Sequence, residues 1–257
     1  MLIDTHSHIN SEKLDELRPE ILKNLKTGRV QRVICPSFSL ESSRTSLDMS
    51  QASPRVWAAL GVHPENCQDY DKATHLWLDE NLSNPKVVAV GEIGLDYHYG
   101  ADDYKEQRAV FEDQIRLAHQ HDLPIVFHMR DAWEDSLSML KEFRSEIKRG
   151  VVHCFDGDRA VAEKILELGY YISFTGLITY RGRDELREVV KIMPKDKLMV
   201  ETDAPYLAPQ AFRGKVNRPE YVSEVADMVA ALWGISSETV DEITTKNAFS
   251  FFDKMGE

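Results

Sequence analysis

Short apolar or β-branched runs recur along this chain, and longer stretches with apolar residues at three- and four-residue intervals lie between them. This alternation is typical of parallel strands joined by crossover helices. The runs predict eight strands, at residues 2–6, 32–35, 56–62, 87–92, 124–128, 150–154, 170–174 and 198–203. Because 257 residues is also close to the size of one such barrel, we expect a single α/β domain over residues 1–257, a (β/α)8 TIM barrel.

Helical periodicity predicts the outer layer of this barrel. The amphipathic stretches are residues 11–26, 74–82, 103–120, 132–148, 159–168, 182–192 and 219–232. Residues 236–252 predict one or two extra C-terminal helices that pack on the outside of the barrel. Residues 206–218 show no clear periodicity, so we expect a functional loop after the eighth strand.

The bulk composition excludes several classes of protein. A formal net charge of -12 argues against a broad basic face for nucleic acid, so a polyanionic substrate must be bound locally. Cys35, Cys67 and Cys154 are odd in number and far apart, which fits neither a disulfide framework nor a Cys-x-x-Cys zinc site and favours a reducing cytoplasm. No basic and apolar leader is present, and no apolar run approaches the ~18 residues that span a bilayer, so we expect no membrane association.

Two histidines at the start of the chain are the first candidate metal ligands. His6 and His8 are two positions apart, and on a strand that spacing turns both imidazoles to the same side. Taken alone, the pair fits two polar turn residues as well as it fits two metal ligands, because imidazole binds metal only where other ligands converge.

Other metal-competent side chains come at the ends of predicted strands. His6 closes the first strand, and the fourth, fifth, sixth and eighth strands close with Glu92, His128, His153 and Asp203. In a parallel barrel these strand ends meet at one rim, where barrel enzymes build their active sites. Four histidines and two carboxylates suit two ions better than one, because a catalytic zinc site uses few protein ligands and keeps a position open. Glu92 is well placed by chain position to bridge the two ions.

The residues at this rim belong to motifs that closely resemble the TatD family of metal-dependent deoxyribonucleases, a branch of the amidohydrolase superfamily. The motifs are Asp-Thr-His-Ser-His from residue 4, Gly-Glu-Ile-Gly-Leu-Asp-Tyr from residue 91, Leu-Pro-Ile-Val-Phe-His-Met-Arg-Asp-Ala from residue 123, His-Cys-Phe from residue 153 and Glu-Thr-Asp-Ala-Pro-Tyr-Leu from residue 201. The resemblance runs from Met1 to the region of Asn247. Residues 155–158, Phe-Asp-Gly-Asp, are more acidic than the hydroxyl-containing version expected there.

The resemblance implies a two-metal site. One ion is expected between His6, His8, Glu92 and Asp203, and the other between Glu92, His128 and His153, with no departure from the family at these positions. Magnesium, manganese, zinc and nickel all suit such mixed nitrogen and oxygen ligands. The expected reaction is hydrolysis of DNA phosphodiester bonds, as an exonuclease on single strands, by a monomeric protein. Asp203 and Glu92 are the expected catalytic residues, with Asp203 both a ligand and a proton acceptor.

Further residues are candidates for supporting roles. Glu201 shares a strand side with Asp203, which predicts either an outer ligand of the site or a residue lining the barrel beneath it. His63 closes the third strand and favours a substrate or phosphate contact over a plain loop histidine. Asp4 is as compatible with orienting His6 as with a purely structural role at the start of the strand.

A local basic group is expected on the late loops of this acidic chain. Arg130 follows the fifth strand, and phosphate sites in barrels commonly use the loops after strands seven and eight. Those loops carry Arg181, Arg183, Arg213, Lys215 and Arg218. Tyr206 and Phe212 lie among them, and each fits either base stacking or anchoring of the loop. Histidines away from the strand ends, His75, His98, His119 and His121, are expected to be solvated.

Two other functions remain open on the sequence. The same ligand set suits hydrolysis of a small-molecule amide or ester, or of an aminoacyl ester. A metal-binding scaffold without catalysis is the alternative from another class, and it requires a blocked water position that nothing bulky in the sequence suggests.

Overall fold

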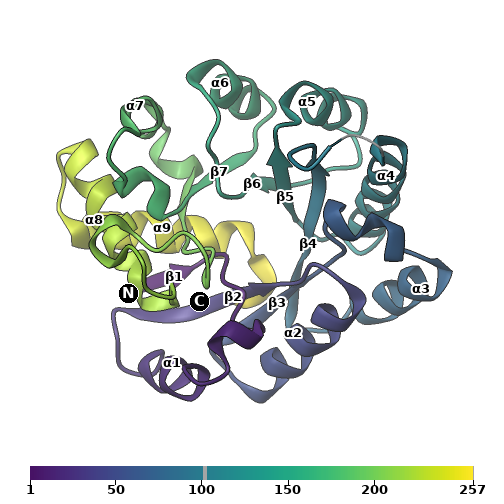
Figure 1. The fold of residues 1–257 in the computed structure, drawn as a ribbon, viewed down its shortest axis with the longest axis horizontal. Helices are drawn as coiled ribbons and strands as arrows, with labels where there is room; N and C mark the ends of the chain where they lie inside the picture. The colour runs from purple at the N-terminus through teal and green to yellow at the C-terminus, as the bar shows by residue number, and fades with distance from the viewer. Residues whose placement is uncertain (101–102, 257) are drawn as a thin grey trace.

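The computed structural model describes residues 1–100 and 103–256, and within them the expected TIM barrel is confirmed. Eight parallel strands lie in chain order and form a nearly closed barrel inside a ring of helices (Figure 1). The strands are β1 Leu2–Asp4, β2 Val30–Pro36, β3 Val56–Leu60, β4 Val87–Asp96, β5 Ile125–Arg130, β6 Gly150–Val152, β7 Tyr171–Phe174 and β8 Leu198–Val200.

The helices alternate with these strands. The α-helices are α1 Arg18–Asn24, α2 Leu40–Ala52, α3 Lys72–Asn81, α4 Tyr104–Gln120, α5 Trp133–Glu142, α6 Arg159–Glu167, α7 Asp184–Ile192, α8 Val222–Trp233 and α9 Ser237–Phe251. Short 3-10 helices are η1 Glu12–Leu14, η2 Pro64–Asp69, η3 Gly176–Thr179, η4 Lys195–Lys197, η5 Gln210–Phe212, η6 Pro219–Tyr221 and η7 Asp253–Met255. The single helix expected over residues 11–26 is wrong, because the chain divides there into η1 and α1, and Pro19 lies in the first turn of α1.

Helix α2 was not indicated by apolar periodicity. Its buried face consists of Ser42, Ser43, Ser46 and Ser50 with Leu47 as the one large apolar residue. Small hydroxyl side chains can pack tightly against β2 and β3 because they hydrogen-bond there, as Ser43 Oγ does to Ser37 Oγ (2.7 Å). A hydrophobic pattern therefore cannot show this helix.

The barrel interior has its own apolar cluster, separate from the layer between strands and helices. Residues near the strand starts, including Ile3, Trp57 and Met199, pack there against Phe251 and Phe252. Helix α9 crosses the centre of the ring in Figure 1 and contacts β1 and β8. The expectation that residues 236–252 pack on the outside is therefore wrong, because α9 covers the end of the barrel at which the strands begin.

The barrel closes between the chain segments that follow β1 and β8. Strands β1, β6 and β8 are shorter than predicted, so His6, His153 and Asp203 lie just beyond them, whereas Glu92 and His128 lie inside the longer β4 and β5. The closing hydrogen bonds are from Thr5 N–H to Val200 O (3.3 Å), from Asp203 N–H to His6 O (2.9 Å) and from His8 N–H to Ala204 O (2.7 Å). The candidate ligands thus form part of the barrel seam.

The helices and the cysteines bear on the expectations about membranes and disulfides. Among the described helices, none combines the length and apolar character needed to cross a bilayer. Cys35, Cys67 and Cys154 are free thiols, and Cys154 lies next to the candidate ligands.

Candidate metal centre

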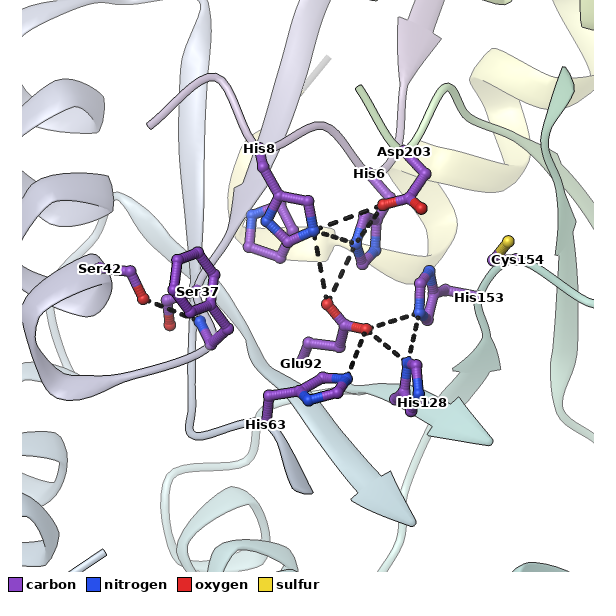
Figure 2. Close-up of polar contacts among 12 residues, drawn as sticks. His6, His8, Ser37, Ser42, His63, Glu92, His128, His153, Cys154 and Asp203 are labelled. Carbon is purple, nitrogen blue, oxygen red and sulfur yellow. Dashed lines mark hydrogen bonds and ion pairs between the residues drawn. The ribbon is translucent and has the colours of Figure 1, made fainter. Parts of the chain in front are cut away.

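All the candidate ligands named from the sequence meet at the carboxyl-terminal end of the barrel. Figure 2 shows Glu92 in the middle, with His6, His8 and Asp203 on one side and His63, His128 and His153 on the other. A cavity of about 700 Å³ opens over them, and His8, Glu92, His128, His153 and Asp203 all line it. Residues from the ends of five different strands therefore line the same cavity.

Glu92 directs its two carboxylate oxygens to different groups of histidines. Its Oε2 atom lies 3.4 Å from His6 Nε2 and 3.6 Å from His8 Nε2. Its Oε1 atom lies 2.7 Å from both His128 Nδ1 and His153 Nε2. A carboxylate held in this way can bridge two cations, one on each oxygen.

The group on the Oε2 side has the dimensions of a four-coordinate site. The Nε2 atoms of His6 and His8 are 3.3 Å apart, and Asp203 Oδ1 lies 3.7 Å and 3.4 Å from them. Ligand atoms about 2.1 Å from a tetrahedral ion lie roughly 3.4 Å from one another. These donor atoms therefore fit around one metal ion.

The group on the Oε1 side offers fewer protein ligands. His128 Nδ1 and His153 Nε2 are 3.2 Å apart and share Glu92 Oε1 as their neighbour. Fewer protein ligands leave coordination positions for water or substrate, as catalytic sites require. Among the described residues, three triads of donor atoms lie close enough to hold a cation: His6, His8 and Asp203; His6, His153 and Glu201; and His63, Glu92 and His128.

The electrostatics also suit cations. Burial opposes ionisation of Glu92, but the charge of His153 and the hydrogen bonds from His128, His153 and His6 hold the pKa of Glu92 well below its usual range. Burial likewise opposes ionisation of Asp203, yet His8 and His6 lower its pKa. Burial and the charge of His153 lower the pKa of His6, which keeps this imidazole in the neutral form that binds metal. Burial opposes protonation of His8, His128 and His153 too, but the neighbouring carboxylates outweigh it and raise the pKa of all three, so a bound metal would take the place of protons on these rings.

Asp96 is a functional candidate that the sequence reasoning missed. Its Oδ2 atom lies 2.8 Å from His128 Nε2, and its Oδ1 atom accepts the N–H of His98 at 2.9 Å. The side chain is almost fully buried. A carboxylate on the second imidazole nitrogen fixes the ring and leaves Nδ1 with a lone pair for a metal. The predicted fourth strand ended at Glu92, whereas β4 continues to Asp96, so the even spacing that puts the two carboxylates on one side of the strand was not seen.

Glu201 and Asp4 support the site from behind. Glu201 Oε1 accepts the N–H of Cys154 (2.6 Å) and lies 3.5 Å from His153 Nδ1, and its side chain is buried away from the cavity. Asp4 accepts backbone N–H groups of His6 (3.3 Å) and Thr202 (2.9 Å). Asp4 therefore orients the His6 backbone at the seam, and its carboxylate does not bond the imidazole.

His63 presents a hydrogen-bond donor to the centre. Its Nδ1 atom accepts the N–H of Glu65 (3.1 Å), so the ring proton lies on Nε2, which is 3.6 Å from Glu92 Oε1. Burial and the neighbouring charge of His128 lower the pKa of His63 to about 3, so the ring is neutral. A protonated Nε2 cannot ligate a metal, although distance alone groups His63 with Glu92 and His128. It can donate to an anionic oxygen.

The predicted basic group divides into two parts. Arg130 and Arg183 line the cavity, and the guanidinium of Arg130 lies over the ring of Tyr99 at 5.5 Å. Arg213 and Lys215 are absent from the described cavity lining, and the guanidinium of Arg213 lies over the ring of Tyr180 at 4.3 Å. Arg218 also points elsewhere, to Glu220 and Glu20.

The other sequence candidates also have clear positions. Tyr206 lines the cavity and is 48% exposed, whereas Phe212 stacks on Tyr221 with ring centroids 3.8 Å apart and so anchors its loop. Asp156, in the acidic segment after His153, lines the cavity too, where burial raises its pKa. The remaining histidines have surface partners: His75 bonds Asp113, His98 bonds Asp131, His121 bonds Asp79, and His119 bonds the carbonyl oxygen of Glu146.

Comparison with known proteins assigns this arrangement to a family. The family model described as TatD related DNase matches residues 3–253. The chain belongs to this family. The TatD resemblance carried by the motifs is thereby confirmed.

TatD relatives match over nearly their whole length. An uncharacterized metal-dependent hydrolase, YabD of Bacillus subtilis, is 39% identical over 98% of this chain and 99% of its own. A protein of a Rahnella species named 3′-5′ ssDNA/RNA exonuclease TatD is 32% identical over 95% of each chain. The crystal structure of YJJV, a TatD homolog from Escherichia coli, superimposes with a TM-score of 0.91 at 30% identity over 98% of each chain. The barrel and its motifs are therefore those of the TatD family.

Proposed function

We propose that this protein is a metal-dependent hydrolase that cleaves phosphodiester bonds of nucleic acid, with DNA as the favoured substrate. The observation that carries the proposal is the position of Glu92, whose two oxygens face two separate donor groups. The name of the B. subtilis relative supports metal-dependent hydrolysis, and that of the Rahnella relative supports an exonuclease acting on single strands.

Two divalent cations fit the residues of the centre. His6, His8, Glu92 and Asp203 would hold one, and Glu92, His128 and His153 the other, with Asp96 fixing the ring of His128. Paired ions in such sites supply an activated water near neutral pH and neutralise charge on the attacked phosphate. Magnesium, manganese, zinc and nickel are all compatible with these nitrogen and oxygen donors.

The chain's own residues divide the remaining work. Asp203 contacts the histidines through Oδ1, while Oδ2 makes no hydrogen bond within the described chain and can accept a proton on the cavity side. His63 Nε2–H is positioned to donate to an oxygen of the scissile phosphate. Arg130 and Arg183 offer guanidinium groups at the cavity lining to flanking phosphates, which suits local binding of a polyanion by an acidic protein. We propose that Arg213 and Lys215 contact the part of a single-stranded nucleic acid that extends beyond the cavity. We also infer that the protein is a monomer and works in a reducing cytoplasm.

The direct test is cleavage of single-stranded DNA and RNA, labelled at the 3′ or the 5′ end, in chelator or with added magnesium, manganese or zinc. Stepwise shortening from one end, dependent on metal and absent in Glu92→Ala, is the expected result. Glu163→Ala is the matched control, because Glu163 is an exposed carboxylate that pairs with Arg159 on α6. Hydrolysis of an ester or amide panel without cleavage of any nucleic acid would contradict the proposal and favour the small-molecule alternative.

A further inference from the structure

Two exposed aromatic side chains stand beside His8 at the mouth of the cavity. Phe38 follows β2 and Tyr206 follows β8, so they flank the end of β1 from its two neighbouring strands. Their ring centroids lie 5.9 Å and 6.3 Å from that of His8, each with an edge-on orientation. Both line the cavity, with Phe38 38% exposed and Tyr206 48% exposed.

Phe38 is held rigidly although its ring faces solvent. Its N–H donates to Ser42 Oγ (2.9 Å), and its carbonyl oxygen accepts from His63 N–H (3.0 Å) and Asn66 Nδ2 (2.9 Å). Figure 2 shows Ser42 and Ser37 on this side of the centre. Exposing an apolar ring to water and fixing its backbone are both unfavourable for the free protein. A rigid, exposed ring of this kind is typical of a surface that binds a ligand.

Tyr206 is fixed in the same way by a buried polar side chain. Asn217 is fully buried, and its Nδ2 donates to the carbonyl oxygens of Tyr206 (2.5 Å) and Thr202 (2.8 Å). The Tyr206 N–H donates to Asp203 O (2.9 Å), so the backbone of Tyr206 is tied to that of a candidate ligand. Lys13 Nζ lies over one face of the ring, 4.6 Å from its centroid.

We propose that Phe38 and Tyr206 form a binding subsite for an unpaired nucleobase next to the scissile phosphate. This inference rests on the proposed function and names the part of the substrate that the site recognises. Aromatic faces bind bases of any sequence by stacking, whereas bases inside a duplex are already paired and stacked on their neighbours. The subsite therefore explains a preference for single-stranded ends without any sequence preference.

The test measures the binding of a terminal base separately from cleavage. A single-stranded oligonucleotide carrying 2-aminopurine at its end is titrated, with metal present, into protein in which Asp203→Asn slows cleavage well below the time of the measurement. A second oligonucleotide has an abasic end. Phe38→Leu and Tyr206→Leu in that background replace each ring with a smaller apolar side chain that cannot stack. We expect each to weaken binding of the base-bearing end about 10-fold and to abolish the fluorescence quenching, with little change for the abasic end.

Controls separate this inference from the function on which it rests. Phe212→Leu is the matched variant, because that ring is already stacked on Tyr221 and should not affect base binding. Circular dichroism and melting temperature show whether each variant folds. If Phe38→Leu and Tyr206→Leu bind the base-bearing end like the parent while the wild type cleaves single strands, the subsite is wrong and the nuclease function stands. If the wild type neither binds nor cleaves nucleic acid, both fail.

Discussion

Asp96 Oδ2 lies 2.8 Å from His128 Nε2, on the side of the ring opposite the nitrogen that faces Glu92. This pairing sets which nitrogen of His128 keeps its lone pair. It also fixes the ring plane, since the two residues belong to neighbouring strands that pair at this level. The metal affinity of the Oε1-side group therefore depends on a carboxylate that contacts no ligand atom of the ion.

Asp96→Asn is expected to weaken binding of one cation about 10- to 100-fold while the protein stays folded, because losing an outer partner loosens a ligating imidazole. Titration calorimetry on metal-free protein would measure the affinity. Asp131→Asn is the control, since Asp131 forms a similar pair with His98 at 2.7 Å outside the cavity lining. Equal affinities in Asp96→Asn and the wild type would show that the pair is only structural.

Two substitutions of Asp203 distinguish its role in cleavage from its role in stability. Its φ of 56° lies in the left-handed region, which Asn adopts readily and Ala does not. Asp203→Asn should lower the cleavage rate by roughly 10²- to 10⁴-fold and leave the melting temperature nearly unchanged. Asp203→Ala should lose the same activity and in addition about 1 kcal/mol of stability from backbone strain. Near wild-type cleavage by Asp203→Asn with metal present would exclude it as ligand and proton acceptor.

Gly94 allows close contact of β4 with β5 between the two ligands that they carry. Its φ of 152° is one that residues with a Cβ rarely adopt, and a Cβ there would collide with the carbonyl oxygen of His128. Gly94→Ala is expected to cost about 3 kcal/mol or more and to weaken metal binding by moving His128 away from Glu92. Gly214→Ala has a positive φ but open space around it, so it should cost only about 1 kcal/mol. Denaturant unfolding of both variants distinguishes collision from backbone strain.

Glu220 links stability to pH at a distance from the cavity. Burial alone would raise its pKa, but hydrogen bonds from Arg218 and Asn24 outweigh burial and lower the pKa in the folded state. Glu220 therefore contributes roughly 1 kcal/mol to the free energy of unfolding at pH values above its ordinary pKa of 4.5. This contribution is lost as the pH falls through the lower pKa of the folded state. The stability gap between wild type and Glu220→Gln should be constant near neutral pH and shrink below about pH 4.5.

Urea unfolding at several pH values measures that gap. Asp184→Asn provides the comparison, because Asp184 is 85% exposed in its pair with Arg187 and should contribute little at any pH. A gap that widened as the pH fell would contradict the assigned direction of the Glu220 shift.

The sequence predicted those features that depend on repeating patterns. Strand and helix periodicity gave the barrel, and the parallel direction of its strands then brought His6, Glu92 and His153 to one end. It failed where packing used small polar groups, as in the serine face of α2. It also placed residues 236–252 wrongly, because periodicity shows that a helix has an apolar face and not which surface covers that face.

Within the site, the sequence predicted residue positions better than residue roles. The position of His63 at a strand end was visible, but its protonated nitrogen depends on a backbone N–H two residues away in a local turn. Arg213 and Arg183 looked equivalent on neighbouring loops, yet only Arg183 faces the cavity, since Arg213 lies over Tyr180. Such roles depend on side-chain directions that loop sequences do not specify.

The interior packing by α9 has a consequence for biosynthesis. All eight strands precede Ser237 in the chain, yet the lower part of their interior is completed by Phe251 and Phe252. During translation the strands must therefore wait, with one end of the barrel uncovered, until the residues of α9 leave the ribosome. The fold can therefore be completed only after the last helix has been synthesised. Nascent chains paused before it are expected to expose this end of the barrel to proteases and chaperones.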